Sequence, residues 1–302
     1  MGPLDRSRED ATAPATPSPG SALEVEGLSK TFRVSSPSGR GRVDVVAVDD
    51  VSFAVAPGQS LAIVGESGSG KSTTARMIMG LERPTAGRIA LGGVERGSKR
   101  LRSRERRRYG REIQIVFQDP FSSLDPRQRV RDAIGEVLKL HFDLSAAQRQ
   151  ARIRELLDEV GLDERHAGAL PRSLSGGQQQ RVAIARALAS MPKVLILDEA
   201  VASLDVSIQA QVLNLLADIR QEMGVTYLFI SHDLAVVRQV SDEVVVMRQG
   251  RIIERGSTAQ VLDSPQESYT RTLLDAVPRR GWKPRRRKNV PQEGDDQVPP
   301  TD

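Results

Sequence analysis

Cysteine, aromatic residues and long apolar runs are what this chain has least of. It has no cysteine among its 302 residues, which excludes disulfides, thiolate zinc sites and iron–sulfur ligation by its own side chains. Only 3% of its residues are aromatic, so stacking platforms for single-stranded nucleic acid are scarce. No apolar stretch approaches the ~18–20 residues that span a bilayer, so we do not expect this chain itself to form a membrane channel.

Positive charge is in excess, but it is concentrated near the C-terminus. The formal net charge is +5, and residues 279–288 hold seven Lys and Arg with no acid. Subtracting these seven charges leaves −2 for the rest of the chain, so the basic excess is a property of the tail. Two interpretations of the tail stay open: a solvated end without a partner, or contact with an anion such as a lipid headgroup or a nucleic-acid phosphate. A second basic run, residues 96–108, predicts a solvated loop or a short helix.

The N-terminal segment lacks the apolar core of a secretion signal. It is charged at first and then rich in Ala, Thr, Pro and Ser, which predicts a disordered leader over residues 1–21. We predict one folded domain over residues 22–265 and a C-terminal extension over 266–302 that ends in the basic, disordered tail.

A phosphate-binding loop is the most informative motif that is present. Its pattern, G-x-x-x-x-G-K-[ST], is matched in full by Gly65, Glu66, Ser67, Gly68, Ser69, Gly70, Lys71, Ser72 and Thr73. The loop follows the apolar run 60–64 and precedes a predicted helix over 73–79, so backbone N–H groups and the helix dipole would face the phosphates. Lys71 would reach the terminal phosphates and Ser72 would hold Mg²⁺. The sequence therefore predicts a nucleoside triphosphate site.

A second glycine-containing motif precedes another long helix. It consists of Leu174, Ser175, Gly176, Gly177 and Gln178. With this LSGGQ signature between the phosphate loop and an acidic strand, the chain resembles the ATP-binding cassette (ABC) family. The resemblance covers about residues 22–278. It implies ATP and Mg²⁺ as cofactors and ATP hydrolysis as the activity. It also implies that the signature of one cassette closes over the ATP bound by a second cassette.

Two acids end a short apolar strand, 194–197, at the place where ligands bind in parallel sheets. Asp198 would orient Mg²⁺, and Glu199 would accept a proton from the attacking water or orient that water. His232 also follows a predicted strand, 226–230. The resemblance implies that His232 is a switch residue that contacts the γ-phosphate.

The resemblance also gives roles to three further residues. Gln118 follows the predicted strand 113–117 and would touch Mg²⁺ or the attacking water. Asp205 lies in a loop that would cross to the opposite cassette, although the order Ala-Ser-Leu-Asp departs from the more usual Ser-Ala-Leu-Asp. Phe32 occupies the place of the aromatic residue that stacks on adenine, but a Phe near a strand end is also commonly part of a core.

The order of the predicted elements indicates an α/β fold. Strand signals at 23–26 and 43–48 precede the phosphate loop, and strands alternate with helices from 194 to 247. Residues at about 124–190 are rich in helix formers and predict a helical insertion. We therefore expect a P-loop NTPase core with a mostly parallel sheet, an antiparallel β portion and a helical insertion, as in an ABC nucleotide-binding domain.

The sequence after Gln118 narrows the resemblance. Residues 117–127 resemble the glutamine loop of oligopeptide and dipeptide importer ATPases, and Tyr269 and Thr270 match part of a C-terminal segment of that group. This implies partnership with a second ABC ATPase, two integral-membrane permeases and an extracytoplasmic solute-binding protein. The expected location is the cytoplasmic face of the cell (inner) membrane, as a peripheral subunit.

Alternatives remain open on the sequence alone. The chain could serve a nickel or other solute importer, or an exporter, because these share the catalytic motifs. A nucleic-acid-associated ABC protein is disfavoured, because it would usually show two cassettes or large insertions and neither is visible.

Overall fold

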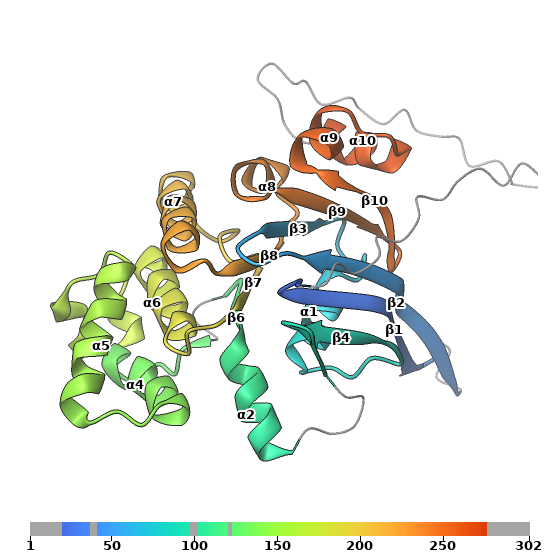
Figure 1. Ribbon diagram of the computed structural model, residues 1–302. Coiled ribbons are helices and arrows are strands. Elements are labelled where there is room, and N and C mark those ends of the chain that lie inside the picture. The colour runs from blue at the N-terminus through green and yellow to red at the C-terminus, as the bar shows by residue number, and fades with distance from the viewer. Residues whose placement is uncertain (1–19, 37–40, 97–101, 120–122, 277–302) are drawn as a thin grey trace, which may run out of the picture.

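The computed structural model describes residues 20–36, 41–96, 102–119 and 123–276 (Figure 1). Residues 1–19 and 277–302 lie outside the described residues, so the leader and the basic tail stay predictions. Ser21, at the end of the predicted leader, is 6% exposed.

The larger of two sheets has six strands in the order β10-β9-β3-β8-β7-β6. All neighbouring strands are parallel except β10, which pairs antiparallel with β9. The bounds are β3 Ser60–Val64, β6 Ile113–Phe117, β7 Val194–Asp198, β8 Thr226–Ile230, β9 Glu243–Arg248 and β10 Arg251–Ser257. Because the carboxyl ends of parallel strands meet at one edge, the residues after β3, β6, β7 and β8 lie near one another.

The second sheet is antiparallel, with the order β2-β1-β4-β5. It contains β1 Leu23–Ser35, β2 Arg42–Val55, β4 Ala86–Leu91 and β5 Val94–Glu95. Helix α1, Lys71–Met79, shares a core with this sheet and with one face of the larger one (Figure 1). Strand β3 is buried on both faces, with Leu61 and Ile63 in that core and Ala62 and Val64 in the other. This is the period-2 alternation of a central strand.

Helices cover the opposite face of the larger sheet and form a lobe beside it (Figure 1). These are α4 Val130–His141, α5 Ala146–Glu159, α6 Gly176–Leu188, α7 Val206–Met223, α8 Leu234–Val240, α9 Thr258–Asp263 and α10 Ser268–Asp275, with the 3₁₀ turns η1 Glu164–Gly168 and η2 Pro171–Ser173. Helix α2, Ser103–Glu112, packs instead on the α1 side, through Tyr109. Local sequence explains several ends: Ser145 caps α5, and Gly224, at φ 64°, ends α7.

The predicted α/β architecture is confirmed, since a mostly parallel sheet, an antiparallel sheet and a helical segment are all present. The strands over 113–117 and 226–230 have the predicted bounds. The first two strands are longer than predicted. β1 continues through pairs from Thr31↔Val46 to Ser35↔Arg42, and β2 continues to Val55 through pairs with the residues from Leu28 back to Leu23. The domain limits at 22 and 265 stay predictions.

Candidate nucleotide site

The phosphate-loop sequence lies between β3 and α1, where the backbone turns sharply. Gly65 has φ 150°, and a Cβ built there would lie 2.2 Å from the Met247 carbonyl oxygen. Gly70 has φ 106°, and its Cβ would lie 2.6 Å from the Ala47 carbonyl oxygen. Any side chain at either position would collide with backbone, so both glycines are required for β2, β9 and the loop to approach this closely.

Lys71 begins helix α1 and turns back over the loop. Its Nζ donates to the carbonyl oxygens of Gly65, at 2.7 Å, and Glu66, at 2.8 Å. The side chain is buried, and burial lowers the pKa of Lys71, while the nearby carboxylates of Glu199, Asp198 and Glu66 raise it. The ammonium therefore lies inside the loop, among the carboxylates of the adjoining strand end.

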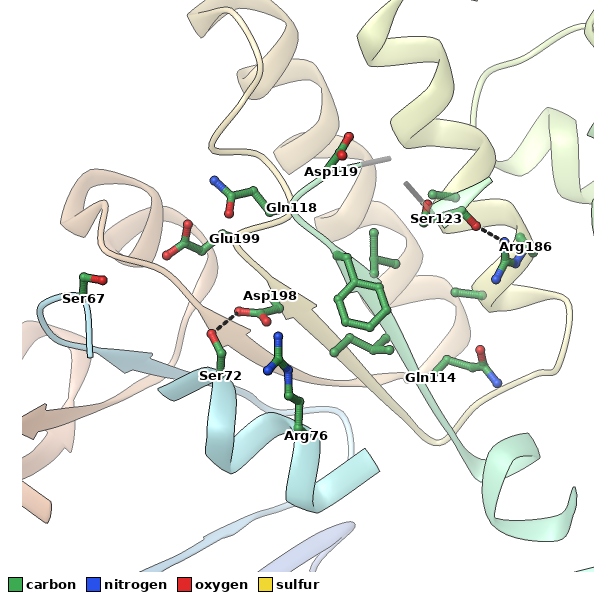
Figure 2. A pocket seen from close by; sticks show the side chains of 15 residues that line it. Ser67, Ser72, Arg76, Gln114, Gln118, Asp119, Ser123, Arg186, Asp198 and Glu199 are labelled. Carbon is green, nitrogen blue, oxygen red and sulfur yellow. Dashed lines mark hydrogen bonds between the residues drawn. The ribbon is translucent and has the colours of Figure 1, made fainter. Parts of the chain in front are cut away.

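Ser72 and Asp198 join the phosphate loop to the end of β7. The Ser72 hydroxyl donates to Asp198 Oδ1 at 3.3 Å across 126 residues of sequence (Figure 2). Burial raises the pKa of Asp198, the Ser72 hydrogen bond and the cations of Arg76 and Lys71 lower it, and the Glu199 charge raises it. A carboxylate and a hydroxyl oxygen at this separation are ligands of the hard type that Mg²⁺ prefers.

Glu199 and His232 meet after β7 and β8. His232 Nδ1 lies 3.1 Å from Glu199 Oε1. The Glu199 backbone is in the left-handed region, at φ 50°, and its N–H donates to the Ile230 carbonyl at 2.8 Å. Such a conformation costs a non-glycine residue of order 1–3 kcal/mol, so the backbone is strained at the residue that carries this carboxylate. No local sequence pattern predicts this strain.

A cavity of about 750 Å³ lies beside these groups (Figure 2). It brings together five of the predicted site residues: Ser67, Ser72, Gln118, Asp198 and Glu199. Gln118 is exposed and follows β6, and its backbone carbonyl accepts from the Ser203 hydroxyl at 3.2 Å. Arg76 and Arg186 also line the cavity, and sequence reasoning missed both, since single arginines in helices carry no motif.

The signature residues lie at another place, at the N-terminus of α6, and line no part of that cavity. Ser175 caps the helix: its hydroxyl accepts from Gln178 N–H at 3.3 Å, and the Gln178 side chain accepts from Ser175 N–H at 2.9 Å. Gly177 is buried, and a Cβ there would lie 2.4 Å from Ile208 Cγ2 of α7. Asp205, the N-cap position of α7, is exposed.

Phe32 lies in β1, opposite Val45. The Lys30 ammonium lies 4.8 Å from the centre of its ring, and the side chain is half-buried. Phe32 does not line the cavity beside Asp198. Adenine stacking by this ring stays a prediction.

Comparison with protein families matches residues 48–202 to the family described as ABC transporter. This segment is half of the chain and contains the phosphate loop, the signature and the acidic strand. The chain belongs to the ABC transporter family. It is accordingly an ATPase that binds and hydrolyses ATP, as the sequence predicted.

Relatives of this ABC protein cover most of its length. It is 43% identical over 258 residues to the oligopeptide transport ATP-binding protein OppF of Lactococcus lactis, an alignment that covers 84% of the chain and 80% of OppF. It is 44% identical over 256 residues to the di/tripeptide transport ATP-binding protein DppF of Pseudomonas aeruginosa, covering 85% and 79%. The dimeric, post-hydrolysis ATP-binding cassette MJ0796 bound to ADP and Pi has a TM-score of 0.68 and 29% identity, over 78% of this chain and 98% of that one.

The described part of this ABC chain contains no helix that is both long and apolar enough to cross a membrane.

The ABC site has a further neighbour, on helix α10. Glu66 N–H of the phosphate loop donates to the Tyr269 hydroxyl at 3.3 Å, across 203 residues of sequence. The Arg248 guanidinium lies 4.7 Å from the centre of the Tyr269 ring, and Tyr269 is buried. The sequence pointed to Tyr269 only as part of a family-like segment. Helix α10 therefore supports the outer side of the phosphate loop.

We expect Tyr269→Phe to weaken ATP affinity about two- to tenfold, because one hydrogen bond to the loop is lost while the ring stays over Arg248. Thr272→Val on the same helix removes a hydroxyl that donates only to Ser268 within α10, and it should leave affinity unchanged. Titration with a fluorescent ATP analogue measures both. Equal affinities in the two variants would show that the contact with Tyr269 does not support the loop.

Proposed function

We propose that this chain is the ATPase subunit that powers import of oligopeptides or dipeptides. The observation that carries the proposal is the similarity to OppF and DppF, whose names specify oligopeptide and di/tripeptide transport, over about 85% of the chain. The glutamine-loop sequence over residues 117–127 also supports it. A putative peptide import ATP-binding protein of Brucella abortus, 46% identical over 257 residues, points to the same class of solute.

ATP would be held by the phosphate loop, with Lys71 on the terminal phosphates and the Phe32 ring on adenine. Mg²⁺ would be held by Ser72, Asp198 and Gln118. When it is bound, this ion neutralises part of the phosphate charge. The oxygen-bearing groups fit this ion, and Mg²⁺ is usually bound by one or two carboxylates together with substrate phosphates.

Glu199 would accept the proton of the attacking water. Its carboxylate lies at the strand end next to Asp198, and His232 Nδ1, 3.1 Å away, holds its orientation. The other ring nitrogen of His232 would face the γ-phosphate. Loss of that phosphate would remove the charges that keep two cassettes closed.

A second cassette, either another copy or a related chain, would complete the site. Ser175, Gly176, Gly177 and Gln178, with Asp205, would close over the ATP of the opposing subunit. Two observations support this: the signature residues line no part of the cavity beside Asp198, and the similar cassette MJ0796 was solved as a dimer.

The remaining partners follow from the importer class. Two permeases would receive the motion through the Gln118 loop, and a solute-binding protein would act through them outside the cytoplasm. The chain would then sit as a peripheral subunit on the cytoplasmic face of the membrane.

The experiment is reconstitution of the chain with its genetically neighbouring permeases, ATPase and binding protein in vesicles. We expect ATP turnover to rise when di- to pentapeptides are added with the binding protein, and labelled peptide to accumulate inside. Glutathione and Ni²⁺ are the comparison solutes, since a relative 49% identical over 235 residues is named for glutathione import. Stimulation by Ni²⁺ alone, or export of peptide, would refute the proposal.

A further inference from the structure

A histidine in the helical lobe contacts the signature motif. His166 belongs to the 3₁₀ turn η1, and its side chain is 12% exposed. Its Nδ1 lies 2.7 Å from Asp163 Oδ1, and its Nε2 lies 3.1 Å from Gln178 Nε2. The ring therefore joins a carboxylate at the start of η1 to the glutamine of the signature.

The contacts fix which atom donates in each hydrogen bond. The Gln178 Oε1 accepts from Ser175 N–H at 2.9 Å, so the Gln178 amide orientation is set. The amide nitrogen can only donate, and His166 Nε2 must therefore accept from it. The proton of the neutral ring then lies on Nδ1 and is donated to the Asp163 carboxylate.

The same capping geometry occurs at two other helices, which serve as internal references. Ser145 with Gln148 caps α5 at 2.9 and 3.3 Å, and Ser257 with Gln260 caps α9 at 3.0 and 3.3 Å. In the described part of the chain, neither Gln148 nor Gln260 donates its amide to a histidine. The histidine is thus not needed to begin a helix, and it is added where the cap is the signature motif.

We propose that His166 is a positioning residue that fixes the Ser175–Gln178 pair for contact with the nucleotide of the opposing cassette. The proposal rests on the proposed composite site. Asp163 orients the His166 ring, the ring holds the Gln178 amide, and the amide holds the Ser175 backbone. Without the ring, the Gln178 side chain is free to leave its cap, and Ser175 spends less time in the conformation that closes over ATP.

Three variants at this position distinguish a positioning hydrogen bond from simple filling of space. His166→Phe keeps a ring but has no acceptor. His166→Gln places an amide oxygen near the position of Nε2, and His166→Asn places one near the position of Nδ1. If the Nε2 acceptor is what matters, Gln restores function and neither Phe nor Asn does.

The experiment measures ATP turnover of the full complex with permeases, and ATP affinity of each separate chain. We expect His166→Phe and His166→Asn to lower turnover at saturating ATP about three- to tenfold, the range for one hydrogen bond, and His166→Gln to stay within about twofold of wild type. Affinity of the separate chain should not change, because the signature serves the other cassette's nucleotide. Asp163→Ala changes an exposed side chain and should also lower turnover, because it removes the carboxylate that orients the His166 ring. It replaces His166→Phe in the test if that variant does not fold.

Ser175→Arg in the same complex distinguishes a failure of the proposed His166 role from a failure of the composite site. If Ser175→Arg abolishes turnover while His166→Phe and Asp163→Ala do not lower it, only the role of His166 is refuted. A His166→Gln variant as impaired as His166→Phe would also refute it. If Ser175→Arg has no effect, the composite site itself is wrong and this inference falls with it.

Discussion

Replacing Glu199 with glutamine should lower steady-state ATP turnover of the assembled complex by about 10²–10⁴-fold, the usual worth of a positioned base. Glutamine has nearly the same size, and its side-chain oxygen can still accept from His232 Nδ1, now 3.1 Å from Glu199 Oε1. What is lost is the carboxylate that we propose takes a proton from the attacking water. ATP binding should persist, because the substitution removes a negative charge that would repel the phosphates.

Release of inorganic phosphate measures turnover, and filter binding of labelled ATP measures occupancy. Glu222→Gln, at an exposed position of α7, makes the same chemical change away from the site and should behave as wild type. Near-normal turnover of the Glu199→Gln complex would reject Glu199 as the base.

The second large effect separates the two halves of the proposed composite site. Lys71→Ala should reduce ATP affinity of the single chain by about 10²-fold or more, because it removes the ammonium that would make charge-assisted hydrogen bonds to the phosphates. Ser175→Arg should leave that affinity within about twofold. It should nevertheless block ATP-driven closure, since a bulky cation would replace a hydroxyl at the face presented to the other cassette.

Isothermal titration gives the affinities, and light scattering with ATP gives the mass of the closed assembly in a Glu199→Gln background. Ser145→Arg is the matched control, because Ser145 caps α5 with the same reciprocal bonds at 2.9 and 3.3 Å. Replacing Ser145 removes the cap of α5 and lowers stability by about 1 kcal/mol, while the signature residues are unchanged. If Ser175→Arg weakened binding by the single chain as much as Lys71→Ala does, the two-halved site would be wrong.

The match between predicted and observed elements depends on how each element is stabilised. Strand β8 has the predicted bounds because all five of its residues are buried, so the apolar run itself marks the strand. Strand β1 extends to Ser35, nine residues past its predicted end, and its last three residues are exposed. Backbone pairing with β2 holds that part, and pairing between strands is not visible in the local composition of either one.

Sequence by itself determined the family, the fold class and the identity of the chemical groups, because a phosphate loop, a signature and an acidic strand end require fixed residues at short spacing. Only the tertiary structure decided which distant residues meet. The contacts between Ser72 and Asp198, Glu66 and Tyr269, and His166 and Gln178 each depend on packing of separate elements. The strain at Glu199, at φ 50°, likewise arises where β7 ends against β8. The physical reason is that each side chain carries its chemical groups wherever it lies in the sequence, whereas the distance between two side chains that are far apart in sequence is set by how the core packs.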